Sequence, residues 1–532
     1  MKRSFALGLA GAAVLASTAV TGSTAQAAPG LQFGPCPEDV SKPYPQLQCA
    51  ELQVPLDYRD PSGEQLKLLV SKQPARKPEA RRGSLLINPG GPGGPGVGFA
   101  GSLAAKLPAA VLDSYDLIGF DTRNVAHSTP ISCVDPGTYW KTPLPDPDAP
   151  QAREQNWQRA QQYADGCQQR AGKYLPHLNT PTNARDVDRI REALGEQKIS
   201  YLGYSYGTYL GAVYGQLFPQ HVDRMILDSM VNPDTSEIWY RNNLNQDIAA
   251  QERLGLYFDW IAQHDDVFHL GTERRQVQAA WDGVQAELRK APRGKLGPAE
   301  FIDLAFNALY GETSWKPLAE GLADFHLRND DKKLADQVEP KDELAENGNA
   351  IYNAVECADA PWPTRQREWE RDSERLAKDY PLAAWYNSWT VAPCRFWQAP
   401  RQEPLKITGD GLPPVLLFNS EHDVATPYEG ALEMHRSLPS SVMVTERDAG
   451  KHGVWALAGN AEADRIGTDY LVNGTLPPDD VEVPGHPAPD PKAPATQQKT
   501  LDLPLTRGRP GPTPDPAFRS RRTTQCPSAT GF

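Results

Sequence analysis

The stretch Ile199–Gly211 constrains the fold of this chain more than any other. It reads Ile-Ser-Tyr-Leu-Gly-Tyr-Ser-Tyr-Gly-Thr-Tyr-Leu-Gly, which is an apolar run, a turn between Gly203 and Gly207, and a run that can continue as a helix. Glycine allows two chain segments to approach more closely than residues with side chains can. We therefore predict a buried strand and a helix joined by a sharp turn, with the hydroxyl of Ser205 exposed at the turn.

Apolar runs of strand length recur on both sides of this stretch. The predicted strands are 52–58, 67–71, 84–88, 115–121, 224–229, 414–419 and 441–445, and a helix is predicted over 182–195. Strands that alternate with helices in this way are typical of a largely parallel sheet. Together with the G-x-S-x-G turn, they predict an α/β-hydrolase fold, which has a mostly parallel central sheet with helices on both faces.

The character of the chain changes in the middle and again near the end. Residues 232–411 are charged, aromatic and helical in pattern, without a bounded strand-like run, and predict an inserted helical cap domain. The hydrolase core would then comprise residues 28–231 and 412–477. Residues 478–532 are Pro-rich and polar, which predicts an extended tail.

The first residues have the pattern of a signal peptide. Lys2 and Arg3 precede an apolar run over 5–20, and Ala25-Gln26-Ala27 fits the small-x-small cleavage rule, so residues 1–27 would be removed. A membrane anchor is the alternative, but the run is short and rich in Gly and Ala. We expect a secreted, extracellular protein, free or associated with the cell surface, with no integral membrane segment after cleavage.

Export favours disulfides for the seven cysteines, whose spacings fit no metal site. We pair them sequentially as Cys36–Cys49, Cys133–Cys167 and Cys357–Cys394, although sequence alone does not determine connectivity, and Cys526 is left over.

The net charge of −13 argues against nucleic acid as a partner. We expect a monomer that needs no metal and no cofactor.

A serine hydroxyl becomes a good nucleophile only when a base removes its proton and an acid orients that base. In the predicted fold, the partners follow in the order Ser, acid, His. Asp423 follows the strand 414–419 and is the candidate acid, with Glu421 as the alternative. His452 follows the next strand on a Gly-flanked loop. Among the ten histidines, only His452 combines chain order, strand and loop, so we predict catalytic roles for Ser205, Asp423 and His452.

The Gly-rich loop 88–96 follows the strand whose loop supplies an oxyanion donor in this fold. We predict that the backbone amides of Gly91 and Tyr206 form the oxyanion hole. A phosphate-binding loop is disfavoured, because neither a Lys-Ser/Thr ending nor a G-x-G-x-x-G at a helix start is present.

Several stretches together resemble the secreted tripeptidyl aminopeptidases of actinobacteria, which are α/β-hydrolase serine peptidases related to prolyl aminopeptidases. The matching stretches are Asn88–Gly93, Gly119–Asn124, Gly203–Thr208, Asp423–Pro427, His452-Gly453 and Tyr470–Pro477. The resemblance runs from about Cys36 to Pro477. It implies hydrolysis of peptides near a free N-terminus, with release of tripeptides.

Recognition of a free amine requires a carboxylate in the cap, for which Glu356 and Asp359 are the candidates, because Cys357 anchors their segment in the expected pairing. Three alternatives remain open. The same machinery can serve an esterase or lipase acting on small esters, or a prolyl aminopeptidase that releases single residues. An inactive hydrolase fold that acts as a binding module is disfavoured by the intact Ser, Asp and His set.

Overall fold

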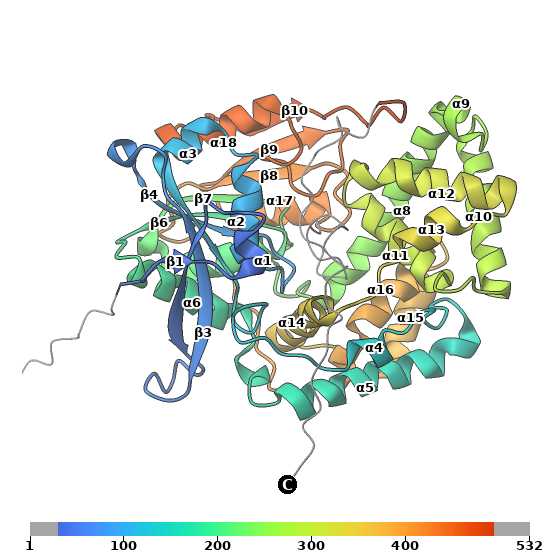
Figure 1. Cartoon of the computed structure of the whole chain (residues 1–532), viewed down its shortest axis with the longest axis horizontal. Helices are drawn as coiled ribbons and strands as arrows, with labels where there is room; N and C mark the ends of the chain where they lie inside the picture. The colour runs from blue at the N-terminus through green and yellow to red at the C-terminus, as the bar shows by residue number, and fades with distance from the viewer. Residues whose placement is uncertain (1–29, 494–532) are drawn as a thin grey trace, which may run out of the picture.

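A computed structural model describes residues 30–493 of the protein (Figure 1). In this part of the chain, ten strands form one sheet in the order β1-β2-β3-β5-β4-β6-β7-β8-β9-β10. The pairs β1–β2, β2–β3 and β3–β5 are antiparallel, and the remaining pairs are parallel. The strands are β1 Gly34–Pro35, β2 Gln48–Pro55, β3 Gln65–Gln73, β4 Gly83–Asn88, β5 Tyr115–Phe120, β6 Ile199–Tyr204, β7 Val222–Asp228, β8 Leu416–Ser420, β9 Val442–Arg447 and β10 Val481–Pro484.

Helices cover both faces of the sheet, as predicted. Leu85 and Ile87 of β4 point to the face packed against α2, α3 and α18, while Leu86 between them points to the face packed against α6, α7 and α17. This alternation follows from the period of two in a strand. The helices of the core are α1 Glu38–Ser41, α2 Gly96–Ala104, α3 Ala109–Ser114, α6 Thr180–Ala193, α7 Tyr206–Leu217, α17 Tyr428–Ser437 and α18 Ala461–Asn473.

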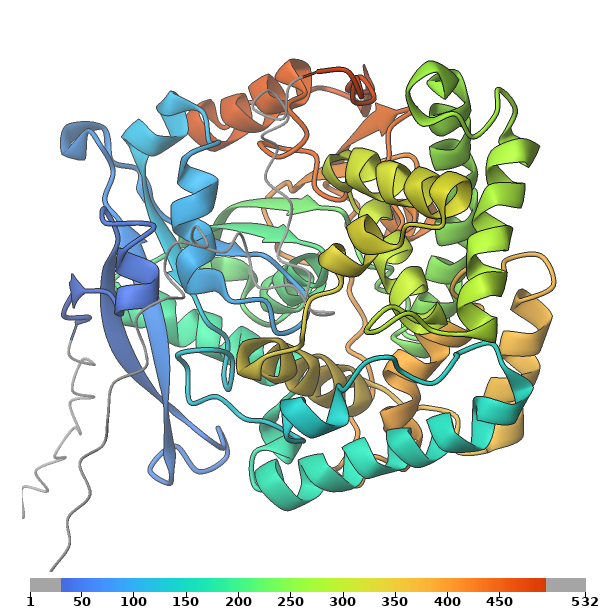
Figure 2. The same ribbon diagram turned by 45° about the vertical axis from the view of Figure 1, so that its right-hand side comes forward.

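A second group of helices lies beside the edge of the sheet where the parallel strands end (Figures 1 and 2). These helices are α4 Pro136–Tyr139, α5 Arg153–Ala171, α8 Tyr240–Gln263, α9 Asp265–Phe268, α10 Arg274–Lys290, α11 Pro298–Leu309, α12 Trp315–Arg328, α13 Lys332–Gln337, α14 Glu343–Asp359, α15 Gln366–Leu376 and α16 Ala384–Val391. We refer to residues 232–411 as the cap. Helices α8 to α12 have a buried apolar core of their own, which Val424 and Ala425 of the hydrolase core join.

Helix α5, which falls within the predicted core segment 28–231, packs against the cap. Its Trp157 ring contacts the rings of Trp369 and Trp389, and Arg153 pairs with Glu374 of α15. The apolar face of α5 is therefore covered by the cap, and the partner of such a face is not visible in its own sequence pattern.

The sheet also extends past Pro477, where the sequence predicted an extended tail. Strand β10 pairs in parallel with β9, and Val483 is fully buried. The rest of the predicted tail from residue 494, the signal peptide over 1–27 and Cys526 lie outside the described residues. The domain boundaries themselves stay predictions.

Three disulfides join the pairs expected from the sequence, namely Cys36–Cys49, Cys133–Cys167 and Cys357–Cys394. Cys357 lies on α14, and Cys394 follows α16, so the third disulfide ties two cap elements together. Over residues 30–493, no helix is long and apolar enough to cross a membrane.

Candidate active site

Ser205 lies at the sharp turn between β6 and α7, in a backbone conformation that residues with side chains rarely adopt. Its φ is 57° and its ψ is −128°. The Ser205 amide donates to the carbonyl of Asp228 at 3.1 Å, and the Thr208 hydroxyl donates to the Ser205 carbonyl at 2.6 Å. A Cβ at position 207 would lie 2.8 Å from the carbonyl oxygen of Asn88, so glycine is required there. These contacts hold the turn in place, and strain of this kind is typical of functional sites.

Asp423 and His452 come together although 29 residues separate them. Both oxygens of Asp423 lie 2.9 Å from Nδ1 of His452. The same carboxylate accepts the amides of Ala425 at 2.9 Å and Thr426 at 3.1 Å. Because a carboxylate only accepts hydrogen bonds, Nδ1 is the protonated nitrogen, and the lone pair of the imidazole lies on Nε2.

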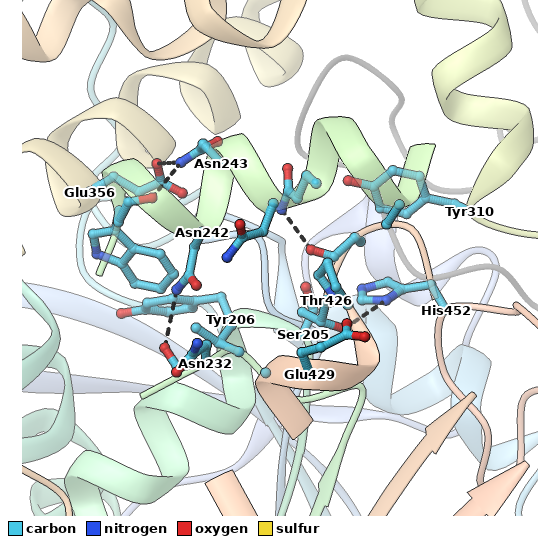
Figure 3. Close-up of a pocket in the computed structure, with 18 of the residues that line it drawn as sticks. Ser205, Tyr206, Asn232, Asn242, Asn243, Tyr310, Glu356, Thr426, Glu429 and His452 are labelled. Carbon is cyan, nitrogen blue, oxygen red and sulfur yellow. Dashed lines mark hydrogen bonds between the residues drawn. The ribbon is translucent and has the colours of Figure 1, made fainter. Parts of the chain in front are cut away.

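Ser205 and His452 line the same pocket, together with Gly91, Tyr206 and Glu356. His452 is 3% exposed, and its Nε2 is buried without a hydrogen-bond partner among the described residues. A buried nitrogen lone pair without a partner is costly, which points to a role with a bound molecule. Figure 3 shows Ser205 and His452 on one side of the pocket and Glu356 with Asn243 on the other.

The loop that carries His452 is held from two sides. On the core side, the buried carboxylate of Asp228 accepts the amides of Val454 at 3.0 Å and Trp455 at 2.7 Å. Burial raises the pKa of this carboxyl well above its usual value, although these amides oppose the rise. On the cap side, the His452 amide donates to the carbonyl of Tyr310 at 2.8 Å, and the two rings meet edge to face.

Asp228 and Tyr310 were not singled out from the sequence. Asp228 lies next to the end of the predicted strand 224–229, and its position near the catalytic edge of the sheet could have been recognised from the sequence. Nothing in the sequence around Tyr310 points to the site, because this residue reaches His452 only through the packing of the cap.

The Gly-rich loop after β4 lies directly against the turn at Ser205. A Cβ at Gly90 would lie 2.7 Å from Cβ of Ser205 and 3.0 Å from the amide nitrogen of Tyr206. Gly90 and Gly91 have φ values of 94° and 115°, which glycine adopts readily. Gly91 of this loop and Tyr206 at the start of α7 both line the pocket beside Ser205.

The structure separates the two candidate amine-binding carboxylates. Glu356 is 2% exposed, lines the pocket and accepts from Nδ2 of Asn243 at 3.1 Å. Asp359 lies behind the pocket wall, where it accepts the amide of Thr180 at 2.7 Å, the Thr180 hydroxyl at 2.6 Å and the indole N–H of Trp239 at 3.2 Å. Burial raises the pKa of Asp359 to about 6, although these hydrogen bonds oppose the rise.

One group of possible metal ligands lies outside the pocket. Ligand atoms of Glu421, His422 and Asp448 lie within 4.8 Å of one another in the described part of the chain. Glu421 is already bonded to Arg447 at 3.1 Å and to the Asp448 amide at 2.9 Å. We assign no metal to this surface group. Glu421, the alternative acid, contributes no bond to His452 among the described contacts.

The fold and this pocket define a serine hydrolase with the α/β-hydrolase fold. A profile described as a TAP-like protein matches residues 380–483, the segment that contains Asp423 and His452. A tripeptidyl aminopeptidase from Streptomyces coelicolor is 45% identical over 476 residues, which cover 87% of this chain and 87% of that protein. The chain belongs to the tripeptidyl aminopeptidase family and is a serine peptidase.

More distant relatives carry different names. The serine protease Hip1 of Mycobacterium tuberculosis is 31% identical over 458 residues, covering 81% of this chain and 86% of that protein. A protein named carboxylesterase B from the same organism is 32% identical over 452 residues, covering 81% and 85%. Among solved structures, an esterase from Thermogutta terrifontis is 12% identical with a TM-score of 0.34, covering 80% of this chain and 97% of that chain.

Proposed function

We propose that this protein is an exported peptidase that releases tripeptides from free N-termini through an acyl-enzyme on Ser205. The observation that carries the proposal is one pocket, lined at one end by Ser205 and His452 and at the other by the buried carboxylate of Glu356 (Figure 3). The name of the Streptomyces coelicolor relative supports the same reaction. The three disulfides support export, because such bonds persist in oxidising compartments.

In the proposed reaction, the Ser205 hydroxyl attacks the scissile carbonyl carbon while Nε2 of His452 takes its proton. Asp423 keeps Nδ1 protonated and stabilises the imidazolium that forms. The amides of Gly91 and Tyr206 donate to the oxyanion. His452 then gives the proton to the leaving amine, and a water molecule hydrolyses the ester on Ser205 by the same steps.

Glu356 would hold the free α-amine of the substrate. An ammonium group that enters a buried pocket needs a carboxylate to offset the loss of its hydration. Glu356 lines the pocket that holds Ser205, whereas Asp359 is not among the residues that line it. We therefore assign the amine to Glu356 and a structural role to Asp359.

The decisive experiment is mass spectrometry of the products from a peptide library with free and acetylated N-termini. We expect tripeptides from free N-termini and no cleavage of acetylated peptides, and Ser205→Ala should abolish both cleavage and labelling by a fluorophosphonate probe. Cleavage of both libraries at internal bonds would contradict the proposal.

A matched pair of variants tests the amine site. Glu356→Gln should raise KM for free peptides and reduce the preference over acetylated peptides by about 30-fold or more, because removing one partner of a buried charge pair costs about 2 kcal/mol or more. Glu343→Gln, an exposed change at the start of the same helix, should keep that preference. If both variants retain the wild-type preference, Glu356 does not bind the amine.

The second candidate function is an esterase, favoured by the relative named carboxylesterase B. Ester hydrolysis alone does not distinguish the two, because an acyl-enzyme forms from both substrates. A kcat/KM for amine-free esters above that for peptides with free N-termini would favour the esterase. Release of single residues in the library experiment would instead favour a prolyl aminopeptidase.

A further inference from the structure

The segment 481–493, which we call the clasp, runs from the core to the cap. It begins as β10 on the edge of the sheet beside β9. Further along, the carbonyl of Pro489 accepts the indole N–H of Trp260 on α8 at 2.9 Å, and Lys492 pairs with Asp266 on α9. The clasp thus contacts both parts of the molecule within a few residues (Figure 1).

His486 lies at the centre of the clasp, between two carboxylates. Its Nδ1 is 3.0 Å from Oε1 of Glu446 at the end of β9, and its Nε2 is 3.2 Å from Oε2 of Glu312 in the cap. Glu446 is fully buried, and the side chains of His486 and Glu312 are 11% and 12% exposed. A neutral imidazole has one N–H, so donating to both carboxylates requires the doubly protonated ring.

The charges around His486 fit an imidazolium. Burial opposes its charge, but hydrogen bonds to Glu312 and Glu446 outweigh burial and raise the pKa of His486 to about 9. Burial would also raise the pKa of Glu312, but Arg253, His486 and Lys451 hold it below its usual value. Asn460 donates to Glu446 at 2.9 Å. Asp464 also lies near Glu446, and burial raises the pKa of Asp464.

The ion cluster of Glu312, His486 and Glu446 holds the cap segment 310–312, and this segment also contacts the loop that carries His452. Glu312 is two residues from Tyr310, whose carbonyl accepts the His452 amide. Arg253, which pairs with Glu312, lies against the same loop: a Cβ at Gly450 would be 2.6 Å from Nε of Arg253. On the core side, Oγ of Ser420 lies 3.1 Å from Glu446 and 2.8 Å from the carbonyl of Lys451, next to His452.

We propose that the clasp fastens the cap to the core through the Glu312–His486–Glu446 ion cluster, and that His486 is a positioning residue for the His452 loop. His486 can donate to both Glu312 and Glu446 only while its ring is doubly protonated, so the clasp holds the cap to the core in that state. Since its pKa is raised on folding, the stabilisation is complete below the ordinary pKa of about 6.5 and is lost as the pH rises through about 9.

The test compares His486→Gln, which keeps one donor and removes the charge, with His221→Gln. His221 is a half-buried histidine that pairs with Asp188 at 2.6 Å, and it lies at the amino end of β7, the opposite end from Asp228. At neutral pH, we expect His486→Gln to lower kcat/KM by about tenfold, because small displacements of a catalytic group carry large costs in rate. His221→Gln should stay within about twofold of wild type.

Two readouts do not depend on the reaction. Thermal unfolding of wild type should show a loss of stability as the pH rises through about 9, and His486→Gln should lack this transition. Hydrogen exchange at Tyr310–Ser314 should be faster in His486→Gln than in wild type. Equal exchange in both proteins would contradict the proposed role of His486, and so would a transition near pH 9 that persists in His486→Gln. Either result would leave the peptidase assignment unaffected.

Discussion

At the scale of single residues, the hydrogen bonds of Asp423 determine how the imidazole of His452 is oriented and which of its nitrogens carries the proton. Asp423 uses one oxygen for the amides of Ala425 and Thr426, and both oxygens lie at hydrogen-bond distance from Nδ1 of His452. The backbone amides fix the carboxylate, and the carboxylate fixes the tautomer of the imidazole. A small chemical change at this acid should therefore act on the reaction far more than on the fold.

Asp423→Asn tests this expectation. An amide nitrogen facing Nδ1 would favour the wrong tautomer, and kcat should fall by about 10⁴-fold, as in other serine peptidases altered in the same way. Steady-state kinetics on a peptide of four or more residues with a free N-terminus measure the loss. Glu421→Gln, two residues away, is the matched control and should leave kcat nearly unchanged. A similar loss in both variants would contradict the assignment of the acid.

A substitution at Asp228 tests whether the hydrolase core holds the loop that carries His452 in position. Alanine has no acceptor, so Asp228→Ala should leave the amides of Val454 and Trp455, which both reach Oδ2 of Asp228, without their partner. We expect a loss of about 1–3 kcal/mol of stability for a buried unpaired donor and a lower kcat with little change in KM. Urea unfolding and steady-state kinetics measure both effects. Asp223→Asn, an exposed change at the start of the same strand, should alter neither the stability nor kcat.

At the scale of elements, α14 links the pocket to the rest of the protein. It carries Glu356, and its start is fixed to the core by the buried Glu346, which accepts the Cys133 amide at 3.0 Å and the Trp140 indole N–H at 2.7 Å. Its end is fixed by Asp359 and by the Cys357–Cys394 disulfide. The position of Glu356 is thus set at both ends of one helix.

Removing that disulfide should therefore affect amine recognition. We expect the Cys357→Ala/Cys394→Ala variant to lose about 2–4 kcal/mol of stability and to show a higher KM for free peptides. Removal of Cys36–Cys49, which lies in a separate apolar cluster near the start of the chain, should lower stability without changing KM. Denaturant unfolding and kinetics of both variants check this. Equal KM effects would show that α14 is not the relevant element.

At the scale of the whole molecule, the sequence predicts export and cleavage of residues 1–27. When the full chain is expressed in an actinobacterial host, we expect the protein in the medium or at the cell surface, with a mature N-terminus near Ala28. Intact-mass measurement and N-terminal sequencing check this, and light scattering tests the expected monomer. A full-length chain retained in the cytoplasm would contradict the export prediction.

Local pattern was enough to determine much of this protein. The run from Ile199 to Gly211 predicts β6, the turn at Ser205 and α7, because a strand and a helix joined by glycines have few alternatives. The order of Ser205, Asp423 and His452 after buried strands narrowed ten histidines to the one that the structure places beside Asp423. Membership of the family follows from the same stretches.

Tertiary structure alone decided the rest. Which of Glu356 and Asp359 lines the pocket, which surface covers α5, and what His486 contacts all depend on residues far apart in the chain, such as the 174 residues between Glu312 and His486. Local propensity determines where strands and turns form. It does not determine which buried charges meet, because that depends on how whole helices and strands pack against one another.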